Sequence, residues 1–256
     1  MGDTNASKRI IISLHNIYFN QLSDKQKERG SRFLLSECPD AAKDVRVLFL
    51  NLNPRMNLPH EEPNRPCLNR QERFWFDEGW KRAYYFKYIF YAIGEKLANP
   101  DWSYRESRRN DDWSRIDSAD IHSESILAAY AYPLRTRDEK DLHKNNPDAA
   151  HLSEQLWKEI LSNVLPSRLK IVVTGDAPFD MVCNLLNAGN VRAIKTNRLY
   201  WGRPSTIKFA DADGRKILRF PQATRCPLVG VDASKPGESG TDYVQAIDTA
   251  LDFLVN

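Results

Sequence analysis

The chain has 256 residues, of which 41% are hydrophobic and 28% are charged, with a formal net charge of only +3. This length and composition suit one globular domain spanning residues 1–256, and the small net charge means that any nucleic-acid contact depends on where the charges lie. No apolar run approaches the roughly 20 residues that cross a bilayer, and residues 1–8 lack the apolar core of a signal peptide. We therefore expect a cytoplasmic protein that makes no membrane contact.

The first half of the chain is predicted to begin with a loosely packed lead over residues 1–20 and a charged helix over 23–35. An apolar run predicts a strand over 45–50, and the prolines that follow it predict an irregular loop over 53–73. Apolar residues at helical spacing then indicate a helix with Ala83, Phe86, Phe90, Ile93 and Leu97 on one face. The polar stretch 99–120 is expected to be an excursion on the surface.

The second half alternates strands with helices. Strands are predicted over 125–132, 169–174 and 216–220, with strand-like pieces near Ile194 and over 206–209. A helix is expected to begin at Asn146-Pro147, a second at Asp176, acting as its N-cap with Pro178 in the first turn, and a third to end the chain. This alternation predicts an α/β fold with a mainly parallel central sheet covered on both faces.

Polar residues follow the first predicted strand directly, in the order Asn51-Leu52-Asn53-Pro54-Arg55. In open α/β sheets, ligands bind at the carboxyl edge of the strands, where this segment would lie. A neutral amide such as that of Asn53 can position a water molecule without having to titrate. The alternative is that Asn-Pro only ends the strand and begins a turn.

A second junction lies far downstream, where the strand over 216–220 runs into Pro221-Gln222-Ala223-Thr224-Arg225-Cys226. The two junctions together resemble the signature segments of the uracil-DNA glycosylase-like superfamily. They are most similar to its mismatch-specific uracil and thymine branch, which has a strand ending in Asn-Pro-Gly and a later loop that wedges into DNA. The resemblance implies a three-layer α/β/α sandwich over most of residues 40–255.

The resemblance also implies roles for individual residues. Asn53 would orient the attacking water, and Arg225 would fill the hole left by a flipped nucleotide, with Gln222 and Thr224 holding backbone or phosphate. Arg55 stands where the family has Gly, so it would line the base pocket or its rim. The Asp base of other branches is absent at the end of the first strand, which predicts slow turnover. The alternatives are a solvated charge at Arg55 and an ordinary polar turn at 221–226.

Aromatic residues are the other candidates for substrate contact. Phe74 and Trp75 follow the long loop where the mismatch branch has a similar pair, and an aromatic ring stacks on any base. Tyr130 and Tyr132 are expected on one face at the end of the strand over 125–132. Core packing is the alternative for Phe74 and Trp75.

The function that the resemblance implies is that of a monofunctional DNA glycosylase. Such an enzyme flips out a base and hydrolyses its N-glycosidic bond, leaving an abasic site. We expect DNA as the partner, a monomer and no cofactor, and neither the four cysteines nor the five histidines show metal-ligand spacing.

The chain also lacks the Asn with which uracil-selective relatives recognise the pyrimidine edge. Together with Arg55 and the long loop, this favours a bulky modified base. The superfamily includes a phage-defence glycosylase that removes glucosylated hydroxymethylcytosine, and antiviral defence of that type is one expectation. A non-catalytic nucleic-acid-binding module on the same fold is the alternative.

Overall fold

The computed structural model describes residues 6–34, 45–52, 54, 64–66, 89–110, 125–196, 205–221 and 240–256. The labelled helices are α1 (Ala6–Gln21), α2 (Asp24–Arg29), α4 (Tyr104–Asn110), α5 (Glu139–Asn145), α6 (Pro147–Asn163), α7 (Asp176–Leu185) and α8 (Gly240–Val255), and residues 89–98 are also helical. The strands are β1 (Ser31–Arg32), β2 (Val47–Asn51), β3 (Asn64–Arg65), β4 (Ile126–Tyr130), β5 (Lys170–Thr174), β6 (Gly189–Thr196), β7 (Ser205–Ala212) and β8 (Arg215–Phe220). No helix in this described part of the chain is both long enough and apolar enough to cross a lipid bilayer.

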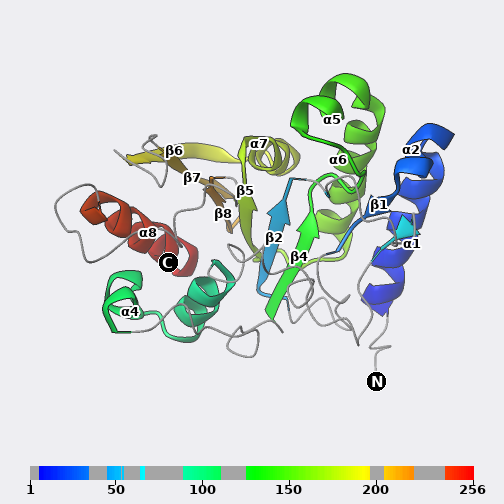
Figure 1. The fold of residues 1–256 in the computed structure, drawn as a ribbon. Coiled ribbons are helices and arrows are strands. Elements are labelled where there is room, and N and C mark those ends of the chain that lie inside the picture. Colours follow the sequence, from blue (N-terminus) through cyan, green and yellow to red (C-terminus); the bar gives the residue numbers. More distant parts are fainter. Residues whose placement is uncertain are drawn as a thin grey trace.

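A six-stranded sheet in the order β4-β2-β5-β8-β7-β6 forms the centre of the molecule (Figure 1). The four strands β4, β2, β5 and β8 are parallel, and β7 and β6 extend the sheet in antiparallel fashion. The predicted α/β class with a mainly parallel sheet is therefore confirmed. The strands predicted over 45–50, 125–132, 169–174 and 216–220 correspond to β2, β4, β5 and β8.

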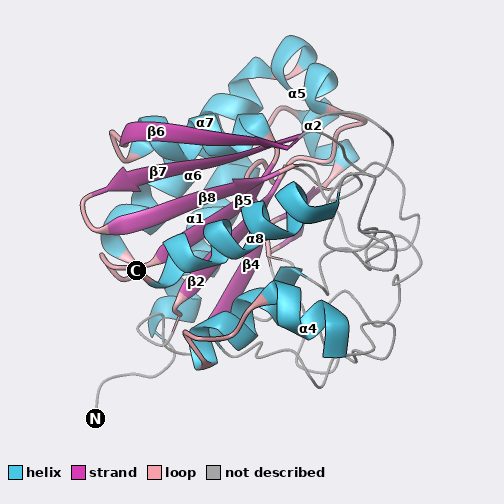
Figure 2. Cartoon of the chain, turned by 90° about the vertical axis from the view of Figure 1, so that its left-hand side faces the viewer, coloured by secondary structure: helices cyan, strands magenta, loops and turns pink. Residues whose placement is uncertain are grey.

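Both faces of the sheet are covered by helices: in Figure 2, α8 lies in front of the strands, and α1, α6 and α7 lie behind them. Along β2, Leu48 and Leu50 belong to one apolar core, which α1, α5, α6 and α7 complete. Val47 and Phe49 belong to the other core, together with residues 89–93, Tyr104 and α8. Successive side chains of a strand point to opposite faces, so a strand buried on both faces needs a continuous apolar run. The run at 47–50 meets that requirement.

The antiparallel part of the sheet depends on a tight turn between β7 and β8. Ala212 pairs with Arg215, so Asp213 and Gly214 alone form the loop, with φ of 45° and 80°. Positive φ at both positions is the type I′ geometry that matches the twist of paired strands, and Asp-Gly is a typical sequence for it. The short strand-like pieces expected near Ile194 and over 206–209 are therefore parts of two eight-residue strands.

The prediction of a loose lead over residues 1–20 is wrong for the described part of that segment. Residues 6–21 form α1, and its Ile11, His15 and Tyr18 are almost completely buried against the core that contains α6. These residues recur at four- and three-residue spacing, which is that of one helix face. Because this buried stripe contains a histidine and a tyrosine, it does not stand out in the sequence as a row of apolar residues.

Two further boundaries differ from the sequence prediction. The helix expected over 23–35 is α2 and ends at Arg29, because Gly30 has a φ of 81° and its N–H closes the helix on the Gln26 and Lys27 carbonyl oxygens. The segment expected as a surface excursion over 99–120 instead docks on α8 where it is described. Tyr104 is fully buried, and its backbone N–H donates to the Asp248 carboxylate at 2.7 Å.

The buried His15 makes the stability of the fold depend on pH. Its ring lies between Tyr18 and Phe33, its Nε2 lies 3.0 Å from the Ser31 hydroxyl, and burial lowers its pKa from 6.5 to about 3. Between these two pH values the unfolded chain binds a proton that the folded chain does not. The contribution of His15 to the free energy of unfolding is therefore fully present above pH 6.5. Below that pH the free energy of unfolding falls, and at pH 5 it has fallen by about 2 kcal/mol.

We expect His15→Gln to remove this part of the pH dependence, measured as urea unfolding at pH 7.5 and pH 5. The matched control is His151→Gln, because the His151 side chain is mostly exposed. An identical change in unfolding free energy between the two pH values for wild type and His15→Gln would contradict the assignment.

Candidate active site at the carboxyl edge of the sheet

The connections that leave adjacent strands β2 and β5 lead to opposite faces of the sheet. After β2 the chain passes through β3, which pairs with β1 beside α1, and the first described helices that follow, residues 89–98 and α4, pack in the core shared with α8. After β5 it enters α7, whose Phe179, Met181 and Val182 pack in the other core. Where neighbouring connections diverge in this way, the carboxyl ends of the two strands border a crevice, which is where open α/β sheets bind ligands. The fold thus places a candidate site between β2 and β5.

The last residues of the four parallel strands form one row across this edge. The strand register pairs Asn51 with Tyr130 and Thr174 with Phe220, and Leu50 with Val173 one residue earlier. Alternation along each strand puts the row on the face that α8 covers, because Phe49, Val172 and Leu218 lie in that core. The row therefore reads Tyr130, Asn51, Thr174, Phe220 from β4 to β8.

Two polar side chains occupy the centre of this row and bind each other. The Thr174 hydroxyl donates to the Asn51 side-chain oxygen at 2.7 Å. Thr174 is fully buried and Asn51 is half-buried. Tyr130 and Phe220, on either side, are buried aromatic residues. The edge of the sheet thus carries a hydrogen-bonded amide and hydroxyl between two aromatic walls.

Tyr130 and Tyr132 do not lie on one face as predicted. Tyr130 packs in the core under α8, whereas Tyr132 packs in the opposite core and contacts the His143 ring at 5.2 Å. The strand ends at Tyr130, and both Ala131 and Tyr132 turn to the same side, so two-residue alternation stops there. The Trp157 indole N–H donates to the Ala131 carbonyl oxygen at 3.0 Å, which fixes this bend. Of the two tyrosines, only Tyr130 belongs to the row.

Backbone hydrogen bonds hold the chain where it leaves β2. The N–H groups of Ala131 and Tyr132 donate to the carbonyl oxygens of Asn51 and Leu52 at 2.7 and 2.9 Å. The segment after β4 therefore continues the pairing beyond the end of the regular strands. It also fixes the two residues that directly precede Asn53 in the sequence.

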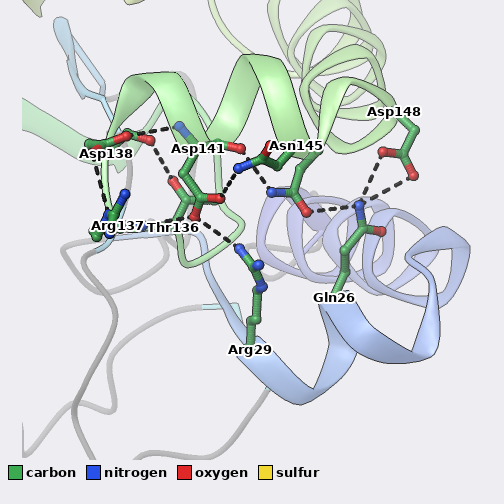
Figure 3. A network of polar contacts seen from close by, with 9 residues as sticks. Gln26, Arg29, Thr136, Arg137, Asp138, Asp141, Asn145 and Asp148 are labelled. Carbon is green, nitrogen blue, oxygen red and sulfur yellow. Dashed lines mark hydrogen bonds and ion pairs between the residues drawn. The ribbon is translucent and has the colours of Figure 1, made fainter.

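A polar network joins α2 to the starts of α5 and α6, the helices that follow this segment (Figure 3). Arg29 of α2 forms an ion pair of 2.9 Å with Asp141 in the first turn of α5, and the Asp138 carboxylate caps the same helix by accepting from the Asp141 N–H. Gln26 donates to Asp148 in the first turn of α6. The pKa of Asp141 is lowered, first by its hydrogen bond with Asn145 and also by Arg29. Helix α2 is thus joined to the first turns of α5 and α6, the two helices that follow the bend at 131–132.

Asp176 is not the helix cap that the sequence predicts. Gly175 occupies the N-cap position with φ 93° and ψ 168°, a conformation essentially restricted to glycine, and Asp176 is the first residue of α7. The Asp176 carboxylate binds Lys208 at 2.6 Å and Arg219 at 2.7 Å. Desolvation opposes ionisation, but these two cations outweigh it and lower the Asp176 pKa. Asp176 therefore ties the start of α7 to β7 and β8.

Most of the residues predicted for the site lie outside the described residues. These are Asn53, Arg55, Phe74, Trp75, Gln222, Thr224 and Arg225. The described residues that flank them are Leu52 and Pro54 after β2, and Pro221 after β8. Both junctions therefore leave the same edge of the sheet, separated only by β5.

Sequence reasoning missed Asn51, Thr174 and Phe220 as residues of the edge. The available signal was that each stands at the end of a predicted strand or directly after it, at a position where parallel strands end together. In the part of the chain that is described, no three His, Cys, Asp or Glu side chains come together as a metal site. A scan against models of known protein families and a search of curated proteins found no match to this sequence.

The ion pairs of Asp176 predict a measurable loss of stability on substitution. Asp176→Asn keeps the shape of the side chain but removes the charge opposite the buried Arg219, so we expect the free energy of unfolding to fall by about 1 kcal/mol in urea. Asp180→Asn is the matched control, because Asp180 lies on the same helix and is exposed. Equal midpoints for Asp176→Asn and wild type would show that the ion pairs do not stabilise the fold.

Proposed function

We propose that the protein is a monofunctional DNA glycosylase that flips a base into the carboxyl edge of the sheet and hydrolyses its N-glycosidic bond. One observation carries this proposal: the two segments that resemble the glycosylase signatures follow β2 and β8, parallel strands separated by one strand. Segments leaving the same edge can act on one nucleotide together. The divergence of connections between β2 and β5 favours the same place for a ligand.

The chemistry requires few charged groups. Cleavage of an N-glycosidic bond builds positive charge on the sugar and negative charge on the departing base. In the proposal, Asn53 positions the water that attacks the sugar, and Arg225 fills the vacated place in the base stack while Gln222 and Thr224 hold the DNA backbone. Phe74, Trp75 and Tyr130 are proposed as walls for the base, and Arg55 as a donor at the rim.

The proposed substrate is a modified base in DNA, with bulky modified cytosines of phage DNA as the first to be tested. Support comes from the sequence alone, through Arg55 at the family's glycine position and the long proline-containing segment after β2. Removal of such a base would leave an abasic site in viral DNA, which is a means of antiviral defence. A non-catalytic nucleic-acid-binding module on the same fold is the competing function.

A direct assay separates the two functions. The protein is incubated with DNAs that each contain one uracil, mismatched thymine, hydroxymethylcytosine or glucosylated hydroxymethylcytosine, and the products are treated with alkali. Alkali-labile strand breaks at the modified position support a glycosylase. Gel shifts together with the absence of breaks in all four DNAs would contradict a glycosylase and favour the binding module.

We expect Asn53→Ala to abolish base release while the dissociation constant for DNA stays within about twofold, because the amide acts on water and not on phosphate. Removing a group that orients a nucleophile typically costs a factor of 10² or more in rate. Asn163→Ala is the control, since Asn163 is an exposed amide in the last turn of α6. Undiminished release by Asn53→Ala would overturn the catalytic assignment.

A wedge at Arg225 predicts a difference between duplex and single-stranded DNA. Unstacking a base costs a few kcal/mol in duplex DNA and nearly nothing in a single strand. Arg225→Ala should therefore impair release from duplex DNA at least tenfold more than release from a single strand with the same base.

The control is Arg168→Ala, which removes one exposed positive charge just before β5, at the opposite edge of the sheet. An equal loss on both DNAs for Arg225→Ala would show a phosphate contact in place of a wedge. The slope of the logarithm of the binding constant against the logarithm of the salt concentration would then decrease by about one.

A further inference from the structure

The hydrogen-bonded pair of Asn51 and Thr174 is not explained by the stability of the sheet. It lies in a row whose outer members, Tyr130 and Phe220, are apolar in character and buried. Polar groups at such a position lose hydration and regain one mutual bond. Replacing both partners of a buried hydrogen bond by apolar groups of the same shape is often neutral or stabilising. The pair is therefore a candidate for binding.

The direction of the hydrogen bond determines what the pair offers to a ligand. A threonine hydroxyl has one hydrogen, and Thr174 donates it to the Asn51 side-chain oxygen at 2.7 Å. The amide is planar, so its oxygen faces Thr174 and its two N–H donors point away from that residue. Among the residues that the structure describes, the Asn51 amide nitrogen has no hydrogen-bond partner. The pair thus presents donors.

We propose that Asn51 donates a hydrogen bond to a ring carbonyl oxygen of the bound base, and that Thr174 is the positioning residue that keeps the donors turned toward it. This inference rests on the proposed function and specifies its substrate class as a base with a ring carbonyl oxygen, which every pyrimidine of the assay carries at position 2. The half-buried Asn51 stands at the border of β2 and β5, where the connections of the sheet diverge. A fixed donor at this place favours a carbonyl group over an amino group.

The test compares each base with its thiocarbonyl analogue, because sulfur is a much weaker acceptor than oxygen. Wild type, Asn51→Leu, Thr174→Val and Thr174→Ser are measured on DNAs with the pyrimidine that wild type processes best and with its 2-thio analogue. Where the base has a second carbonyl, the 4-thio analogue is included. The quantities are kcat/KM for base release and the dissociation constant for DNA, with thermal unfolding to confirm that each variant is folded.

Wild type should prefer the carbonyl base over at least one thio analogue by about threefold to tenfold more than Asn51→Leu does, which is the range expected for one hydrogen bond. Thr174→Val should lose the same preference, and Thr174→Ser should retain it, because serine keeps the hydroxyl. A merely structural pair would change stability and overall rate but not this ratio. The same preference in all four proteins would overturn the inference.

The rate of base release and the dissociation constant for DNA together separate a failure of the proposed function from a failure of the role of Asn51. A wild-type protein that binds these DNAs without releasing a base contradicts the glycosylase, and the carbonyl preference in the dissociation constants then decides the role of Asn51. A protein that releases bases with an unchanged preference in Asn51→Leu remains a glycosylase but does not use Asn51 as the donor. A wild-type protein with no affinity for any of the DNAs overturns both.

Discussion

The structure depends on the burial of β2 between two parallel neighbours. Its backbone pairs with β4 on one side and β5 on the other, and its side chains alternate between the two apolar cores. No position along it is able to accept a charge without cost, because both faces are closed by helices. The strand also marks the place where the connections diverge, since the first described helices after β2 pack on one face of the sheet, while those after β4 and β5 pack on the other.

The same constraint explains why, along β2 and β5, polar side chains appear only at the ends of the strands. Within the sheet, β2 and β5 carry apolar side chains in both cores, and the first polar side chains that face each other across them are Asn51 and Thr174. Farther out, the bend at 131–132 and the network of Gln26, Arg29 and Asp141 hold the edge from the side of α2. Asp176, bound to Lys208 and Arg219, holds it from the side of β7 and β8. The surface that a ligand would contact at this edge is thus held in place by hydrogen bonds and ion pairs on both sides.

The sequence predicted those features whose cause is local. The apolar runs of β2, β5 and β8 and the stripe of α8 were found because burial on fixed faces imposes a period. The edge was less predictable because contacts over long separations decide it. The sequence Asp176-Ala177-Pro178 is typical of a cap, but Arg219, 43 residues later, takes the carboxylate. Tyr130 and Tyr132 separate because the strand ends between them.

Asn51 illustrates the same limit. It stands two residues before Asn53, and nothing in the local pattern indicates that Thr174, 123 residues away, turns its amide. Only the register of β2 against β5 brings the two together. The fold class was therefore predictable from periodicity, whereas the composition of the site edge required knowledge of which strands are neighbours.

The central claim is that DNA binds at the carboxyl edge between β2 and β5, and hydrogen–deuterium exchange tests it most directly. The backbone amides are followed with and without duplex DNA that carries one glucosylated hydroxymethylcytosine, a base of the class proposed as the substrate. The account predicts slower exchange at residues 130–136 and 174–178, which border the edge. Slower exchange confined to residues 165–170 and 212–215, at the opposite edge of the sheet, would contradict it.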